Sequence, residues 1–161
     1  HYDYTWFRAV GPGHGTQPHC DIVYMGRGTR DLLTAWTPIG DIPLEVGGLM
    51  VLENSHRRTD LTGEYLAQDV DTYCENGPGA EAVRTGKIHW EHWQRPGEAW
   101  NGAIGDDPPA LRRRFGGRWL TAREYRMGDV LIFSMATVHA SIDNQSAFLR
   151  LSSDSRYQRA D

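Results

Sequence analysis

The sequence predicts an all-β core of the sandwich or jelly-roll type, and two observations carry that prediction. Short alternating or apolar runs follow one another through most of the chain, separated by Gly, Pro, Asn and Asp. Such runs are typical of strands joined by turns. The long helical patterns that a parallel β-α-β sheet needs are not seen in the sequence. Strands are therefore expected to pack on strands.

The pattern places eight strands, which are expected at residues 4–10, 18–25, 31–38, 47–53, 117–125, 129–134, 137–141 and 147–155. Turn signals separate them. The segment "GPGHG" at 11–15 indicates a loop, "GDIP" at 40–43 a turn and "RMGDV" at 126–130 a tight turn. "IDNQS" at 142–146 indicates a hairpin turn between the last two strands.

A chain of 161 residues is expected to form one domain, 1–161. Residues 57–116 interrupt the strand pattern and predict a long, partly helical insertion or lid between the fourth and fifth strands. Within it, the segments 60–74 and 106–115 favour short helices. The chain begins at His1, within the approach to a strand, so an N-terminal part of the domain is expected upstream.

Composition favours a small-molecule partner over nucleic acid or membrane. Lys and Arg number 17 against 21 Asp and Glu, a net charge of −4 with no long run of one sign. No stretch approaches the roughly 20 apolar residues of a membrane span. Cys20 and Cys74 form no paired motif, which favours a reducing, cytoplasmic compartment. No pattern indicates the oligomeric state.

His19 and Asp21 stand two residues apart at the head of an apolar run. On a strand, residues i and i+2 share one face. The two side chains should then point together, with Gln17 and Val23, while Cys20 points away as a buried packing thiol. A histidine and a carboxylate on one face are two of the three ligands that a two-His, one-carboxylate iron site needs.

His139, on another short strand, is the best third ligand. Arg150 follows eleven residues later, and an arginine within a strand is costly unless it meets an anion. Its planar guanidinium suits a carboxylate. Arg156 shares the strand face of Arg150 and is a second candidate for that anion, although a structural salt bridge to a residue such as Asp154 is the stronger expectation.

These residues lie in motifs that resemble the phytanoyl-CoA dioxygenase family. The motifs are "HCD" at 19–21, "WTPIGD" at 36–41, "GGLMVLENSH" at 47–56, "GDVLIF" at 128–133, "VHAS" at 138–141 and "RLSSDSRYQ" at 150–158. The resemblance implies a double-stranded β-helix, which is a cupin-like jelly roll. It also implies an Fe(II)- and 2-oxoglutarate-dependent dioxygenase, with O2 as the second co-substrate.

The resemblance also implies a set of site residues. The iron ligands would be His19, Asp21 and His139, and the co-substrate contacts Arg150, Ser141 and Trp36. Arg150 would bind the distal carboxylate of 2-oxoglutarate. Gln17 and Arg156 are possible contacts to substrate or co-substrate.

The implied activity is hydroxylation of a C–H bond in a small molecule, with release of succinate and CO2. Desaturation, epimerisation and ring formation stay open. The alternative is a cupin-like metal or small-molecule binding module without oxygenase activity, which has no need of a buried arginine. The substrate itself is not indicated, and the cluster Arg112–Arg114 is more typical of a solvated face than of an acyl-CoA site.

One motif departs from the family pattern. The family usually has Pro-Gly before Ser-His, whereas this chain has Glu53-Asn54 before Ser55-His56. Asn adopts left-handed backbone geometry readily, so no loss is expected. His56 is expected to be structural.

Residues elsewhere gave weaker signals. His89 and His92 lack a third ligand at a suitable spacing, so loop or lid residues are favoured over a second metal site. The tryptophans that either line a pocket or pin the insertion are Trp90, Trp93, Trp100 and Trp119.

Overall fold

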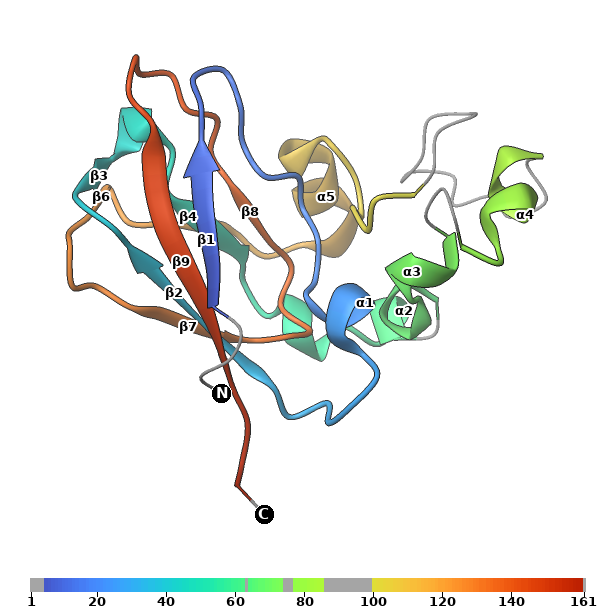
Figure 1. Ribbon diagram of the computed structural model, residues 1–161. Coiled ribbons are helices and arrows are strands. Elements are labelled where there is room, and N and C mark those ends of the chain that lie inside the picture. The colour runs from blue at the N-terminus through green and yellow to red at the C-terminus, as the bar shows by residue number, and fades with distance from the viewer. Residues whose placement is uncertain (1–4, 63, 74–76, 86–99, 161) are drawn as a thin grey trace.

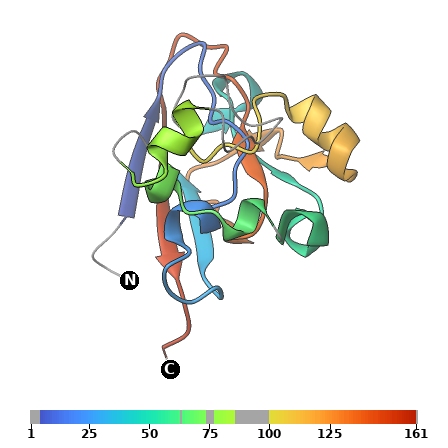
Figure 2. The same cartoon turned by 90° about the vertical axis from the view of Figure 1, so that its right-hand side faces the viewer.

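The computed structural model describes residues 5–62, 64–73, 77–85 and 100–160. In this part of the chain, strands dominate and form antiparallel sheets, with few short helices. The α-helices gather on one side of the strands (Figure 1). Figure 2 views the molecule from that side, with the helices in front of the sheets. The predicted mainly-β character is confirmed.

The largest sheet has four strands, in the order β1 (Thr5–Val10), β9 (Arg150–Tyr157), β2 (Leu33–Pro38) and β7 (Leu131–Ser134). Strand β9 lies at its centre and pairs with both β1 and β2. Burial alternates along β9, and its buried positions are Arg150, Ser152, Asp154 and Arg156. Charged side chains are rarely buried without partners. The inner face of this sheet therefore holds a charged site rather than a purely apolar core.

The other strands form two smaller sheets. One has the order β5 (Trp119–Leu120), β4 (Leu49–Leu52) and β8 (His139–Ser141), and the other pairs β3 (Ile42–Pro43) with β6 (Glu124–Tyr125). The single strand expected at 117–125 is thus wrong. Thr121, between its two halves, donates its hydroxyl to the Leu49 carbonyl at 2.8 Å, and the chain changes sheets there. The turn expected at 40–43 also contains β3.

The strand expected at 18–25 is wrong beyond His19. His19 forms an isolated bridge to His139, and the chain then enters the helical turn α1 (Ile22–Met25). Asp21 already has helical backbone angles, and its carbonyl accepts from the Tyr24 and Met25 amides. Val23 therefore does not share the face of His19 and Asp21, because it is buried in the apolar core.

Short helical segments occur in the described parts of 57–116 and directly before them. They are η2 (Ser55–Arg57), α2 (Thr59–Thr62), η3 (Tyr65–Ala67), α3 (Val70–Tyr73), α4 (Ala80–Arg84) and α5 (Pro108–Phe115), while η1 (Leu44–Val46) lies earlier in the chain. In place of the single helix expected at 60–74 there are three separate short helical elements, α2, η3 and α3. The helix expected at 106–115 is confirmed as α5. Asp107 caps it by accepting from the Ala110 amide at 3.1 Å, and proline follows at its first position.

Two apolar clusters support the sheets. One joins α1, η3 and α5 around Tyr65, Trp100 and Phe115. The other lies around Trp36, with Tyr125 edge-on at 4.9 Å between ring centroids. None of the helices in the described ranges is both long enough and apolar enough to cross a bilayer.

The hairpin expected at 142–146 is wrong, because β8 and β9 belong to different sheets. Asn144, which is fully buried, fixes this crossing. Its amide donates to the carbonyls of Val10 and Phe148 at 3.2 and 2.7 Å, and its oxygen accepts from Ser146. The connection leads directly to Arg150, at the start of β9.

Asn144→Ala is expected to lower the free energy of unfolding by about 2–3 kcal/mol, because the Val10 and Phe148 carbonyls lose their donor and Ser146 loses its acceptor. Urea unfolding followed by circular dichroism measures the change. Gln145→Ala, at an exposed neighbouring position, is the matched control and should shift stability by less than about 0.5 kcal/mol. Equal effects of the two variants would contradict the role given to Asn144.

Candidate metal centre

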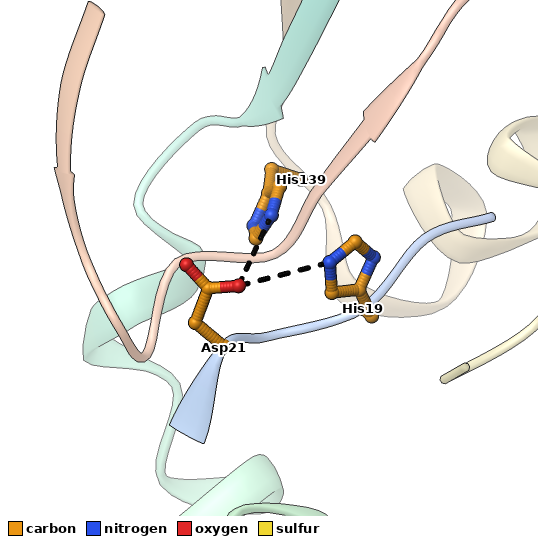
Figure 3. A group of neighbouring side chains, drawn as sticks. All are labelled: His19, Asp21 and His139. Atoms are coloured by element: carbon orange, nitrogen blue, oxygen red, sulfur yellow. Dashed lines mark ion pairs between the residues drawn. The ribbon is translucent and has the colours of Figure 1, made fainter. Parts of the chain in front are cut away.

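Three buried side chains converge where the segment before α1 meets β8: His19, Asp21 and His139 (Figure 3). Asp21 Oδ1 lies 3.8 Å from His19 Nε2 and 3.7 Å from His139 Nε2. One ligand atom from each residue lies within 4.8 Å of the others. The donor set is two imidazoles and one carboxylate on one side of a cavity. That arrangement can hold one divalent metal ion and leave further coordination positions free.

Backbone carbonyls fix both imidazoles. His19 Nδ1 lies 2.7 Å from the Gln17 carbonyl, and His139 Nδ1 lies 3.0 Å from the Thr137 carbonyl. Since a carbonyl can only accept, each Nδ1 donates, and the Nε2 atom of each ring is the one that can face a ligand. Burial, with His139 close by, lowers the pKa of His19 to about 3. His19 is thus a neutral ligand at physiological pH.

Asp21 is held by its other oxygen. Thr34 donates its hydroxyl to Oδ2 at 2.5 Å, and Arg156 Nη2 lies 3.2 Å from the same atom. Burial alone raises the pKa of Asp21, but the charges of His139 and Arg156 bring it below its ordinary value. The carboxylate is therefore ionised, with Oδ2 engaged and Oδ1 facing both imidazoles. This arrangement suits monodentate coordination.

Arg156 forms a salt bridge, as expected, but Asp154 is the wrong partner. Arg156 pairs with Asp21, while Asp154 accepts from Arg8 Nε on β1. Sequence reasoning missed Arg8 and Thr34. Arg8 carried the same signal as Arg150, an arginine within the alternating run "TWFRAV". Thr34 gave no signal, because a threonine is ordinary in a strand.

Arg150 lies beside the centre in a narrow cavity of about 20 Å³, which it shares with Asp21, His139 and Trp36. Its side chain is 1% exposed, and Nη1 donates to the Gly47 carbonyl at 2.6 Å. Arg150 Nε and Trp36 Nε1 have no hydrogen-bond partner in the described part of the chain. Burial lowers the pKa of Arg150 to about 10, so it stays charged at neutral pH. A buried cation with an unused donor fits an anionic ligand such as a carboxylate.

Ser141 and Gln17, two other predicted contacts, lie in different parts of the site. The Ser141 hydroxyl oxygen accepts from the Thr16 amide at 2.6 Å, and its hydrogen can still be donated. Ser141 is not among the described residues that line either cavity at the centre. Gln17 lines a second, larger cavity of about 300 Å³, which also reaches His19 and Asp21.

The described part of the insertion braces the ligand segment. Tyr65 is fully buried; its hydroxyl accepts from the Cys20 amide at 2.9 Å and donates to the Gly102 carbonyl at 2.7 Å. The Ile104 amide also donates to the Pro18 carbonyl at 2.8 Å. Cys20 itself points into the apolar core, as predicted. The peptide between His19 and Asp21 is thus tied to segments far away in sequence.

Tyr65→Phe is expected to weaken metal binding by about tenfold, because the Cys20 amide between two ligands loses its acceptor. Stability should fall by only about 1–2 kcal/mol. Co(II) titration, followed by its visible absorption, measures the affinity, and urea unfolding measures the stability. Tyr125→Phe removes another buried hydroxyl, which donates to the Leu49 carbonyl, and should leave the cobalt affinity unchanged. A Tyr65→Phe variant that binds cobalt as tightly as the parent would show that the Tyr65 hydroxyl does not position the ligands.

The remaining predictions divide between the described residues and those outside them. Asn54 is left-handed, with φ of 59°, as expected in place of glycine. His56 is exposed. Trp119 on β5 donates to the Pro108 carbonyl and so pins the insertion, whereas Trp100 donates to the Ala103 carbonyl within the insertion and is buried in the cluster around Tyr65. Predictions that lie outside the described residues concern Cys74, His89, Trp90, His92 and Trp93.

Comparison with known proteins identifies the family of the chain. The family model described as phytanoyl-CoA dioxygenase (PhyH) matches residues 1–152. The chain belongs to the PhyH family. This family uses Fe(II), 2-oxoglutarate and O2. No curated protein matches the chain.

Several solved structures resemble this PhyH chain. The non-heme alpha ketoglutarate dependent carbocyclase SnoK from nogalamycin biosynthesis is 19% identical, with a TM-score of 0.60 over 98% of this chain and 49% of SnoK. The epimerase SnoN in complex with Fe3+, alpha ketoglutarate and nogalamycin RO is 21% identical, with a TM-score of 0.57 over 97% of this chain and 48% of SnoN.

EctD from S. alaskensis, with 2-oxoglutarate and 5-hydroxyectoine, is 14% identical, with a TM-score of 0.56 over 94% of this chain and 42% of EctD. The PhyH chain therefore spans about half the length of these structures or less. At these identities the likeness supports the fold alone.

Proposed function

We propose that this chain carries the centre of an Fe(II)- and 2-oxoglutarate-dependent dioxygenase that acts on a small molecule. One observation carries the proposal. The candidate ligand atoms of His19, Asp21 and His139 converge beside a buried, incompletely paired arginine, Arg150. Such an iron centre, when loaded, couples the oxidative decarboxylation of 2-oxoglutarate by O2 to the oxidation of a substrate.

The residues of the chain have distinct roles in this proposal. His19, Asp21 and His139 hold the metal on one side and leave the opposite side to the two cavities. Arg150 binds the distal carboxylate of 2-oxoglutarate, with Trp36 as a wall of the same cavity. Ser141 has a hydroxyl hydrogen to donate at the end of β8, where a co-substrate contact is proposed. Arg156 neutralises the outer oxygen of Asp21 and keeps Oδ1 directed at the metal position.

The fold is proposed to be a double-stranded β-helix. The four-stranded sheet supplies Arg150 and the three-stranded sheet supplies His139, so the site lies between two sheets, as a cupin-like jelly roll requires. We propose that 1–161 is one oxygenase domain and that residues 57–116 form an insertion within it. Through Tyr65, that insertion supports the ligand segment as well as covering it.

Hydroxylation is the proposed reaction. An epimerase and a carbocyclase among the similar structures keep other oxidative outcomes of the same centre open. The competing function is a cupin-like metal-binding module without oxygenase activity. The buried Arg150 favours the oxygenase, because a metal-binding module has no use for an unsatisfied cation in its core.

Anaerobic titration with Fe(II) and then 2-oxoglutarate tests the proposal. We expect the weak visible charge-transfer band of an iron-bound 2-oxo acid to develop and to saturate. His19→Ala should abolish the band, whereas His56→Ala, an exposed histidine, should leave it unchanged.

Each alternative result has a defined meaning. Metal binding without the band supports the cupin-like module. A protein that binds no divalent metal contradicts the assignment of the three ligands.

A further inference from the structure

The larger cavity carries an inference about the substrate, which rests on the proposed function. This cavity of about 300 Å³ reaches His19 and Asp21, and its other walls include Trp6, Arg8, Gln17, Tyr24, Met25 and Asn101. We propose that it binds a small anionic substrate, an apolar body carrying one carboxylate, and that Arg8 and Gln17 hold the carboxylate.

The wall of this cavity favours an anion. Among the described lining residues, Arg8 and Arg156 are cationic and Asp21 is the single carboxylate. Asp21 Oδ2 is engaged by Thr34 and Arg156, and Oδ1 faces the imidazoles. Each arginine also has a carboxylate partner, Asp21 for Arg156 and Asp154 for Arg8, so the preference comes from unused N–H donors in the wall, from which an anion can accept and a cationic group cannot.

Arg8 is positioned to bind a carboxylate. Its Nε donates to Asp154 on β9, and its guanidinium lies 5.9 Å from the centroid of the Trp6 ring. In the described part of the chain, Nη1 and Nη2 have no hydrogen bond. The side chain is 37% exposed, so these two groups can reach a ligand. A guanidinium fixed at Nε and open at both Nη atoms suits the two oxygens of a carboxylate.

A chain of hydrogen bonds sets the orientation of Gln17. The Ala103 amide donates to Asn101 Oδ1 at 3.0 Å, so this atom is the oxygen and Nδ2 is the donor. Asn101 Nδ2 then donates to Gln17 Oε1 at 2.8 Å. The Nε2 group of Gln17 must be on the other side of its amide, where it presents two N–H donors. Gln17 thus adds donors for an oxygen ligand next to His19.

Another part of the wall is apolar. The Tyr24 hydroxyl is used at the rim, where it donates to the Asn101 carbonyl at 2.6 Å. Its ring stands edge-on to His19, with 5.6 Å between ring centroids. Tyr24 can pack there because position 102 is glycine: a Cβ on Gly102 would lie 2.3 Å from the tyrosine oxygen. Tyr24, Met25 and Trp6 therefore favour an uncharged hydrocarbon or ring body.

The two anions of the proposed reaction are then bound by different arginines. Arg150 takes the carboxylate of 2-oxoglutarate in the narrow cavity, and Arg8 takes that of the substrate in the larger one. Arg8 also borders the narrow cavity. A test must therefore measure both ligands separately.

The test uses the protein loaded with Zn(II), which supports binding without turnover, and saturating 2-oxoglutarate. Three probes with one body differ in charge: 3-phenylpropionate, 3-phenylpropionamide and 3-phenylpropylamine. Titration calorimetry should show the carboxylate binding about tenfold or more tightly than the amide, and the amine weakest. Arg8→Gln should lower the affinity for the carboxylate probe by about tenfold to a hundredfold and leave the affinity for the amide probe unchanged.

Matched variants separate binding from folding. Arg8→Gln combined with Asp154→Asn avoids a buried, unpaired carboxylate and should show the same loss. Arg8→Lys keeps the charge and should lose less of the affinity for the carboxylate probe than Arg8→Gln does. Arg126→Gln, an exposed arginine paired with Glu124, should bind all three probes as the parent does.

The inference is wrong if the amide or the amine binds as tightly as the carboxylate, or if no probe binds. It is also wrong if Arg8→Gln lowers the affinity for 2-oxoglutarate instead of the affinity for the carboxylate probe, because Arg8 then binds the co-substrate. A protein without metal affinity contradicts the proposed function alone. The carboxylate preference of the metal-free protein, and its dependence on Arg8, then decide this inference independently.

Discussion

Asp21→Ala is expected to bind Fe(II) at least about a hundredfold more weakly than the parent protein, because the only anionic ligand of the three is removed. The two imidazoles that remain carry no negative charge, so neither offsets the charge of the metal. The affinity is measured anaerobically, by competition with a chromogenic chelator.

Folding and metal binding must be separated in this variant. Asp21 is also the ion-pair partner of Arg156, so its removal should lower the free energy of unfolding by about 3 kcal/mol. Asp21→Asn keeps the shape of the side chain and an oxygen to accept from Thr34. It should lose most of the metal affinity while staying folded under the assay conditions, as circular dichroism can verify.

Thr34→Val provides a graded comparison. It leaves all three ligands in place but removes the hydroxyl that holds Asp21 Oδ2, and we expect a loss of about tenfold in metal affinity. A folded Asp21→Asn variant with parental affinity would show that the metal, if bound, is held elsewhere.

The convergence of the three candidate ligands could be predicted from the sequence because the chemistry of a metal site is restrictive. His19, Asp21 and His139 belong to short motifs whose order is specific, and few residue types can replace them. Arg150 was predictable because an arginine within a strand needs an anion. These arguments depend on residue type and position, not on the exact path of the chain.

The local path was predicted less well. The alternating pattern at 18–25 favours a strand, but the tertiary bonds of the Ile22 amide to Met135, and of Tyr65 to the Cys20 amide, turn the chain into α1. The same-face argument for His19 and Asp21 therefore predicted the right pair, although the strand ends between them. The pattern at 142–146 likewise resembles a hairpin, and only the long-range bonds of Asn144 show that the chain changes sheets.

The supporting contacts could not be predicted. Thr34, Tyr65 and Asn101 are ordinary residues in the sequence, and they become part of the site only when distant segments meet. Asp154 pairs with Arg8 instead of Arg156, because the β1–β9 register places Asp154 opposite Trp6, one position diagonal from Arg8 on the same face. Charge pairing across strands depends on register, which a single sequence specifies weakly.

Arg150→Gln is expected to weaken 2-oxoglutarate binding by about a hundredfold without changing metal affinity. The loss corresponds to a charge-assisted contact of about 3 kcal/mol in a buried site. Arg150 does not contact the three candidate ligands through any hydrogen bond or ion pair found among the described residues, so Fe(II) should bind as before. The two affinities are measured in one anaerobic titration, first with metal and then with co-substrate.

Thermal unfolding gives an independent readout of the same contact. A ligand that binds only the folded state raises the melting temperature. With Zn(II) present, 2-oxoglutarate should raise the melting temperature of the parent protein but barely that of Arg150→Gln. Arg150→Lys keeps a charge but loses the planar fork, so its stabilisation should be intermediate. If 2-oxoglutarate stabilises Arg150→Gln as much as the parent, its distal carboxylate is bound by another cation, and Arg8, which borders the same cavity, becomes the candidate.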